Sequence, residues 1–167
     1  VLDEDGPFDA HDVVFIGLQL AAALRHLHGR GFVHLDVKPA NTTLRGERAL
    51  LLDFDLSLPI GGLRSTVQPR GTVHYMSPEQ IRCQPAQPAM DLFGLGALLF
   101  EAATAEHLFT FGSFESVSDS YALPTDYPQL ADIPDIARAA PDLTPEVAAV
   151  IQRLVAADPA DLATMSA

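Results

Sequence analysis

Apolar residues recur at every third or fourth position between Ala10 and His28. This spacing places them on one face of a helix. Asp9 can accept a hydrogen bond from the first turn, and Gly29 with Gly31 can end the helix. The apolar face consists of Val13, Ile16, Leu20, Leu24 and Leu27. The pattern therefore predicts one long helix that packs on one side.

Two short runs of residues with strand propensity follow, from Thr42 to Leu44 and from Ala49 to Leu52. The residues between them, Arg45-Gly46-Glu47, favour a turn, so the two runs predict a small hairpin. From Asp53 to Glu79 the chain is rich in Gly, Pro, Ser and Thr. This composition favours a long mobile segment over a packed element, and long loops in compact domains are usually functional.

The stretch from Met90 to Ala103 is apolar on nearly all sides, which is typical of a helix enclosed by its own domain. We expect this buried helix at about 88–104. Only short helices and loops are expected between Asp119 and Pro141. A last helix is predicted from Pro145 to Ala156, with Thr144 as its cap. Its expected apolar stripe is Val147, Val150, Ile151 and Leu154. The predicted fold is mainly helical, with one small β-hairpin.

Composition narrows the functional classes. The chain has 167 residues, enough for one domain, and a net charge of −12. Nine arginines and one lysine are scattered singly, so no basic patch is expected to bind nucleic acid. The acidity weakly favours basic substrates, but a solvated acidic surface explains it more simply. The single cysteine excludes an internal disulfide framework. The longest apolar run, 92–100, is too short for a membrane span, so we expect no membrane segment and a cytoplasmic location.

The most informative stretch is His34-Leu35-Asp36-Val37-Lys38-Pro39-Ala40-Asn41, which contains the only lysine. An aspartate can accept a hydroxyl proton, an ammonium can neutralise a phosphoryl group, and an amide oxygen can bind a metal ion. Together, at these offsets, they indicate phosphoryl transfer.

This stretch resembles the catalytic loop H-R-D-x-K-P-x-N of eukaryotic-like Ser/Thr protein kinases. Three further stretches resemble that family in its own order. They are Asp53-Phe54-Asp55 (the metal-binding triplet), Gly71 to Glu79 (the end of the activation segment) and Asp91 to Gly96 (the start of the buried helix). The resemblance implies a kinase large lobe over 1–167, of α+β class by family. Its catalytic loop is 34–41, its triplet 53–55 and its activation segment 53–79.

The resemblance also implies roles for single residues. Asp36 orients the substrate hydroxyl, and Lys38 stabilises charge on the transferred phosphate. The pairing of Lys38 with Thr72 is the family's signature for Ser/Thr substrates. Asn41 and Asp53 bind the Mg²⁺ ions of ATP. A shifted alignment would make Asp55 the metal ligand instead, and we prefer Asp53.

Four residues have structural roles by resemblance. His34 packs under the catalytic loop, Phe54 packs in the core beneath the nucleotide site, and Asp91 holds the loop backbone. Glu79 pairs in the family with an arginine, for which this chain has Leu162. We expect no role for the remaining histidines, which are His11, His26, His28, His74 and His107.

Leu35 replaces the arginine that, in many kinases, binds a phosphate on the activation segment. Switching by that route is therefore not expected, and alanine at Ser65 and Thr66 should leave activity largely unchanged. The arginine bias and the alanine abundance point to a GC-rich bacterial genome.

The chain contains no G-x-G-x-x-G loop, and its only lysine, Lys38, belongs to the catalytic loop. Because the chain also begins at Val1 without a methionine, we expect a large C-terminal lobe whose small lobe comes from the rest of the polypeptide. The predicted function is transfer of the ATP γ-phosphate to protein Ser/Thr hydroxyls. A truncated or pseudokinase scaffold that binds a partner without catalysis is the alternative. A small-molecule phosphotransferase fits less well, because that class lacks the closure from Gly71 to Glu79.

Overall fold

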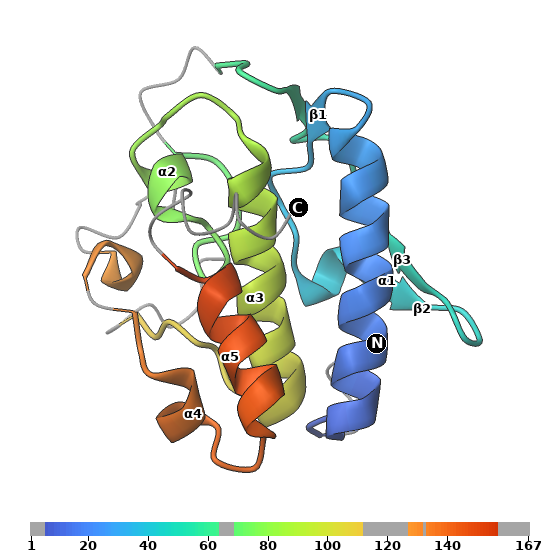
Figure 1. Ribbon diagram of the computed structural model, residues 1–167. Coiled ribbons are helices and arrows are strands. Elements are labelled where there is room, and N and C mark those ends of the chain that lie inside the picture. Colours follow the sequence, from blue (N-terminus) through green and yellow to red (C-terminus); the bar gives the residue numbers. More distant parts are fainter. Residues whose placement is uncertain (1–5, 64–68, 112–126, 132, 157–167) are drawn as a thin grey trace.

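The computed structural model describes residues 6–63, 69–111, 127–131 and 133–156. Three helices form its frame: α1 (Ala10–His28), α3 (Pro88–Thr104) and α5 (Pro145–Leu154). Helix α3 packs against α1 on one side and against α5 on the other (Figure 1). None of the helices among the described residues is long and apolar enough to cross a membrane.

Helix α1 has the predicted bounds. The Asp9 carboxylate accepts a hydrogen bond of 2.9 Å from the Asp12 N–H, and Gly29 ends the helix. Four residues of the predicted face are fully buried, and Leu27 is half-buried. The buried residues are Val13, Ile16, Leu20 and Leu24. The periodicity of apolar positions thus correctly identified the face that packs on α3.

Helix α3 forms the centre of the core. Its residues are buried on most sides, as an apolar helix within a domain should be. Close packing with α5 depends on Gly96: a Cβ there would lie 2.7 Å from Val155 Cγ1 and 2.8 Å from Leu154 Cβ. Phe93 stacks on Phe109, with ring centroids 5.6 Å apart.

Helix α5 begins as predicted, with the Thr144 hydroxyl accepting from the Val147 N–H at 3.4 Å. Its buried face is Ala148, Ile151 and Leu154. The prediction that Val150 belongs to this face is wrong, because Val150 is 47% exposed.

Two small antiparallel sheets flank the frame. Strands β2 (Thr42–Leu44) and β3 (Ala49–Leu51) form the predicted hairpin, with Thr42 opposite Leu51. Strand β1 (Phe32–Val33) pairs with β4 (Leu58–Pro59). The expectation of a segment without packed elements between Asp53 and Glu79 is therefore wrong for β4, whose short backbone pairing leaves no hydrophobic pattern in the sequence.

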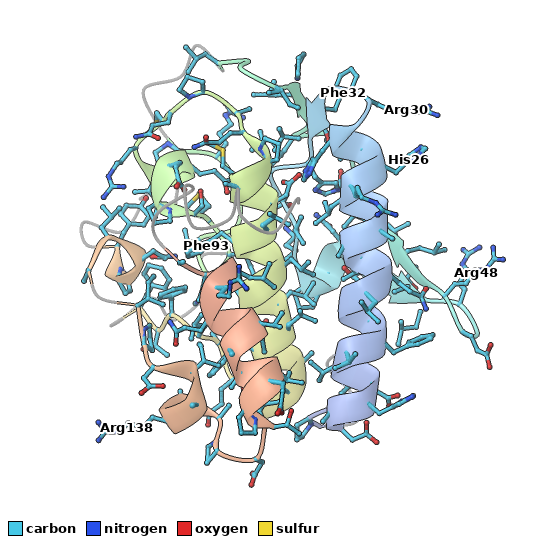
Figure 2. The ribbon with its side chains drawn as sticks, in the orientation of Figure 1. His26, Arg30, Phe32, Arg48, Phe93 and Arg138 are labelled. Atoms are coloured by element: carbon cyan, nitrogen blue, oxygen red, sulfur yellow. The ribbon has the colours of Figure 1, made fainter. Side chains whose placement is uncertain are left out.

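The remaining elements are short. They are η1 (Pro39–Asn41), α2 (Pro78–Ile81), η2 (Pro128–Leu130) and α4 (Ile136–Ala139). Arginine side chains project from separate parts of the surface, as Arg30, Arg48 and Arg138 do in Figure 2. The described surface therefore shows the scattered positive charge that the sequence predicts.

Candidate active site

The first turn of α3 fixes the loop after β1 through hydrogen bonds to its backbone. The buried Asp91 carboxylate accepts from the backbone N–H of His34 at 2.8 Å and from that of Leu35 at 2.7 Å. Leu35 has a φ of 70°, a left-handed conformation that costs free energy for a branched side chain. The two hydrogen bonds to Asp91 offset this cost and fix the backbone immediately before Asp36.

His28, at the end of α1, is the third partner of this carboxylate. Its Nε2 lies 2.7 Å from Asp91 Oδ2. The expectation that His28 has no role is wrong, because this contact ties α1 to α3 beneath the loop. Spacing in the sequence could not reveal it, since 63 positions separate the two residues.

His34 is fully buried, and both of its ring nitrogens have partners. Nε2 lies 3.0 Å from the Leu52 carbonyl, while Nδ1 lies 3.3 Å from the Asp36 N–H. A carbonyl only accepts and an N–H only donates, so the ring carries its proton on Nε2. His34 thereby joins the end of β3 to the backbone of Asp36.

The Asp36 carboxylate has four donors. Thr72 donates to Oδ1 through its backbone N–H at 3.1 Å and through its hydroxyl at 2.9 Å. Asn41 Nδ2 donates to Oδ2 at 2.8 Å, and the Lys38 ammonium lies 2.8 Å from the same oxygen. Lys38 also donates to the Thr72 hydroxyl at 2.6 Å. Asp36, Lys38 and Thr72 thus form a closed triangle of a carboxylate, an ammonium and a hydroxyl.

Asn41 and Asp53 lie at the two ends of the hairpin. The Leu52 N–H donates to the Asn41 carbonyl at 2.8 Å, which places Asp53 one residue beyond this pairing. The Asn41 amide nitrogen is committed to Asp36, so its Oδ1 is the atom left to bind a cation. Asp53 is exposed, with a φ of 58°, and its Oδ1 accepts from the Asp55 N–H at 3.2 Å. Two hard oxygen ligands suit Mg²⁺, so these residues fit the ion.

Phe54 does not pack in the core. It is 51% exposed, and one edge contact with His34 joins it to the domain, with ring centroids 4.9 Å apart. The prediction of a core position is wrong, because the residue turns outward after the left-handed Asp53. Glu79 is buried and has no ion pair among the described residues. Leu162, like Ser65 and Thr66, lies outside the described residues.

A cavity of about 440 Å³ adjoins the triangle, with Lys38 and Thr72 in its wall. His74 stacks on His107 there, with ring centroids 4.1 Å apart, and the Tyr75 hydroxyl donates to Glu101. Burial lowers the pKa of His74, and the nearby His107 adds to the effect, while the hydrogen bond to the Phe109 carbonyl opposes it. Sequence reasoning missed this cluster, because its members come from two distant segments without a recognisable spacing.

The whole chain, residues 1–167, matches the model of the protein kinase domain. The chain belongs to the protein kinase family. Bacterial relatives agree. Serine/threonine-protein kinase AfsK of Streptomyces griseus is 32% identical over 97% of this chain, and PknK of Mycobacterium tuberculosis is 36% identical over 93%. PknL of M. tuberculosis is 32% identical over 96%. The chain covers 20%, 14% and 39% of these three proteins, respectively.

The fold of the kinase chain is also found in a solved structure. The kinase PK-1 of Cydia pomonella granulovirus superposes with a TM-score of 0.75 and 24% sequence identity. The match covers 93% of this chain and 55% of the viral chain. The predicted fold class, a mainly helical kinase-like unit with a small β-hairpin beside the active site, is confirmed. The second small sheet, formed by β1 and β4, was not predicted.

Proposed function

We propose that this chain is the large lobe of a Ser/Thr protein kinase domain, which transfers the γ-phosphate of ATP to serine or threonine hydroxyls of proteins. The triangle of Asp36, Lys38 and Thr72 carries the proposal, because it places a proton acceptor and a cation around one hydroxyl group. The names of the relatives, all Ser/Thr kinases, support it.

The geometry suggests how the substrate hydroxyl is received. A carboxylate offers about four lone-pair sites, and Asp36 has a donor at each. An incoming hydroxyl must therefore replace one donor. The Lys38 ammonium, on its flexible stem, can move without shifting the backbone. Turned from Asp36 toward the phosphoryl oxygens, it would neutralise charge there while Asp36 accepts the hydroxyl proton.

Asn41 and Asp53 are proposed to hold Mg²⁺, with Asp55 as the competing ligand. When bound, the ion neutralises charge on the phosphates and orients them. The hydrogen bond from Asn41 to Asp36 joins the proposed metal ligand to the proposed proton acceptor, so the distance between the two side chains is fixed. The left-handed backbone at Asp53 keeps its carboxylate at the exposed end of the hairpin.

A small lobe outside this chain is part of the proposal. Leu52 and Phe54 are 44% and 51% exposed beside the proposed metal residues. Apolar side chains at a nucleotide site suit a covering lobe that supplies the remaining phosphate contacts. We place this reaction in the cytoplasm, where ATP is available, with protein substrates as partners. A pseudokinase scaffold is not favoured, because the side chains of Asp36, Lys38, Asn41 and Thr72 form one connected polar group.

The test uses the full-length protein with Mg²⁺, radiolabelled ATP and basic and acidic protein acceptors. Phosphoamino-acid analysis should find phosphoserine and phosphothreonine, and chelation of Mg²⁺ should abolish them. Asp53→Asn should weaken Mg²⁺-dependent nucleotide binding at least about tenfold, and Asp55→Asn much less. The opposite ranking would make Asp55 the ligand, whereas labelled small molecules without labelled protein would refute protein kinase activity.

A further inference from the structure

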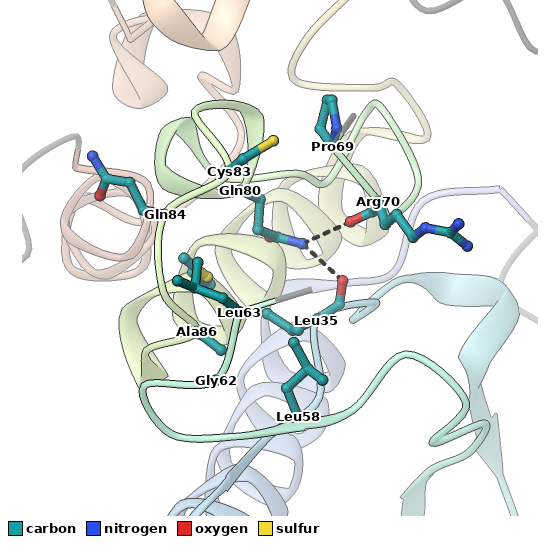
Figure 3. A pocket seen from close by; sticks show the side chains of 11 residues that line it. Leu35, Leu58, Gly62, Leu63, Pro69, Arg70, Gln80, Cys83, Gln84 and Ala86 are labelled. Atoms are coloured by element: carbon teal, nitrogen blue, oxygen red, sulfur yellow. Dashed lines mark hydrogen bonds between the residues drawn. The ribbon is translucent and has the colours of Figure 1, made fainter. Parts of the chain in front are cut away.

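Gln80, on α2, lies between the two segments that form the active site. Its Nε2 donates to the Leu35 carbonyl at 2.9 Å and to the Arg70 carbonyl at 3.4 Å (Figure 3). Its Oε1 accepts from the Ser77 N–H at 3.2 Å. The residue is only 8% exposed, so water cannot readily replace these partners.

The orientation of this amide is fixed from both ends. The Ser77 hydroxyl accepts from the Gln80 N–H at 3.2 Å, and with the reverse bond from the side chain it forms a capping box. Because the oxygen is held by an N–H, the nitrogen must face the two carbonyls. A flip of the amide would point oxygen at oxygen, so Gln80 has one stable arrangement.

The two carbonyls belong to residues that lie one and two positions before the two partners of the contact between Asp36 and Thr72. Leu35 precedes Asp36, and Arg70 precedes Gly71 and Thr72, whose N–H and hydroxyl both donate to Asp36. Gly71 leaves the space for this approach: a Cβ on it would lie 3.2 Å from Gln80 Nε2 and 3.3 Å from the Leu35 carbonyl. One amide therefore joins the catalytic loop to the activation segment beside their functional contact.

The surroundings of Leu35 explain why an amide is needed there. Its side chain lines a cavity of about 60 Å³, whose wall includes the apolar Leu58, Ala86 and Met90. The side chain at this position carries no charge that could hold a phosphorylated segment. The hydrogen bonds of Gln80 act on the backbone of Leu35 instead, and they require no modification of the protein.

We propose that Gln80 is a positioning residue that holds Thr72 on Asp36 without a phosphate on the activation segment. The proposal rests on the proposed kinase function for its effect on catalysis, but not for its effect on structure. Removal of the amide should free the segment around Thr72 and lower kcat. The binding of ATP should stay unchanged, because the Gln80 side chain bonds to Ser77, Leu35 and Arg70 and not to the proposed metal residues Asn41 and Asp53.

The experiment compares Gln80→Leu, which keeps the volume and removes the amide, with Gln84→Leu, an exposed neighbour on the wall of the same cavity. Hydrogen exchange of the Thr72 N–H and steady-state kinetics are measured on the full-length protein. For Gln80→Leu, Thr72 exchange should rise and kcat should fall, each about tenfold, as expected for the loss of one or two neutral hydrogen bonds. The KM for ATP and the exchange of α3 amides should not change, and Gln84→Leu should match the wild type.

Unchanged Thr72 exchange in Gln80→Leu would overturn the proposal, even if the protein is an active kinase. Faster exchange of the Thr72 N–H in a protein that transfers no phosphate would support the positioning role of Gln80 and reject the kinase function. If Gln80→Leu does not fold, Gln80→Asn gives the same test, because its amide remains but is one methylene too short. If amide exchange in α3 rises as much as that of the Thr72 N–H, Gln80 stabilises the whole domain, and its positioning role is refuted.

Discussion

The Asp91 carboxylate offers the sharpest test of how the catalytic loop is held. Asp91→Ala removes the acceptor of two backbone N–H groups, those of His34 and Leu35, and of the His28 ring. Leu35 then keeps its left-handed backbone without the contact that offsets its cost. The loop backbone should therefore lose its fixed position, and the domain should lose stability.

The magnitude follows from the number of donors left without a partner. A buried donor without a partner costs about 1–3 kcal/mol, so the two N–H groups of His34 and Leu35 predict a loss of about 2–6 kcal/mol. A total stability of about 5–15 kcal/mol makes this a large fraction. The lower figure of about 2 kcal/mol already changes the unfolding equilibrium about thirtyfold.

Urea denaturation followed by circular dichroism measures this loss. Glu146→Ala removes an exposed carboxylate from the first turn of α5 and should change stability by less than about 0.5 kcal/mol. His28→Ala removes one partner of Asp91, and its loss of stability should lie between those of Glu146→Ala and Asp91→Ala. If Asp91→Ala costs less than about 1 kcal/mol, the carboxylate does not hold the loop and this reasoning is refuted.

Three further predictions concern packing, pH and regulation. Gly96→Ala should destabilise the protein by about 1–3 kcal/mol in the same denaturation assay, because its Cβ would overlap Val155; an unchanged midpoint would contradict the close packing of α3 on α5. The lowered pKa of His74 means that the unfolded chain binds this proton first, so stability should fall as the pH drops below 6.5. His74→Gln should make the Tm less dependent on pH in that range, and an unaltered pH profile would contradict this. Alanine at both Ser65 and Thr66 should leave kinase activity of the full-length protein largely unchanged. A tenfold loss, about 1.4 kcal/mol in barrier height, would show that phosphorylation of this segment does control activity.

The sequence predicted the elements whose residues repeat with a clear period. Helix α1 was predicted with its bounds and its cap at Asp9, because its apolar face repeats over many turns. The hairpin of β2 and β3 was also predicted correctly, because a turn separates two short runs. Strand β4 was missed, since its pairing with β1 uses backbone groups and needs no particular side chains.

For the site, the resemblance placed Asp36, Lys38 and Thr72 in one reaction centre, and the structure brings the three side chains together. The contacts of His28 with Asp91 and of Gln80 with Leu35 could not be predicted. Each joins residues far apart in the chain, and neither residue type is unusual at its position. Such contacts depend on the tertiary packing of helices, which periodicity within one segment does not report.

Single-turnover phosphate transfer in Asp36→Asn tests the central claim most directly. The asparagine keeps the shape of the side chain but cannot accept the proton, so MgATP binding should match the wild type while transfer to serine or threonine slows by about 10²–10⁴-fold. Equal rates of transfer in the two proteins would show that Asp36 is not the proton acceptor and would contradict the account of this site.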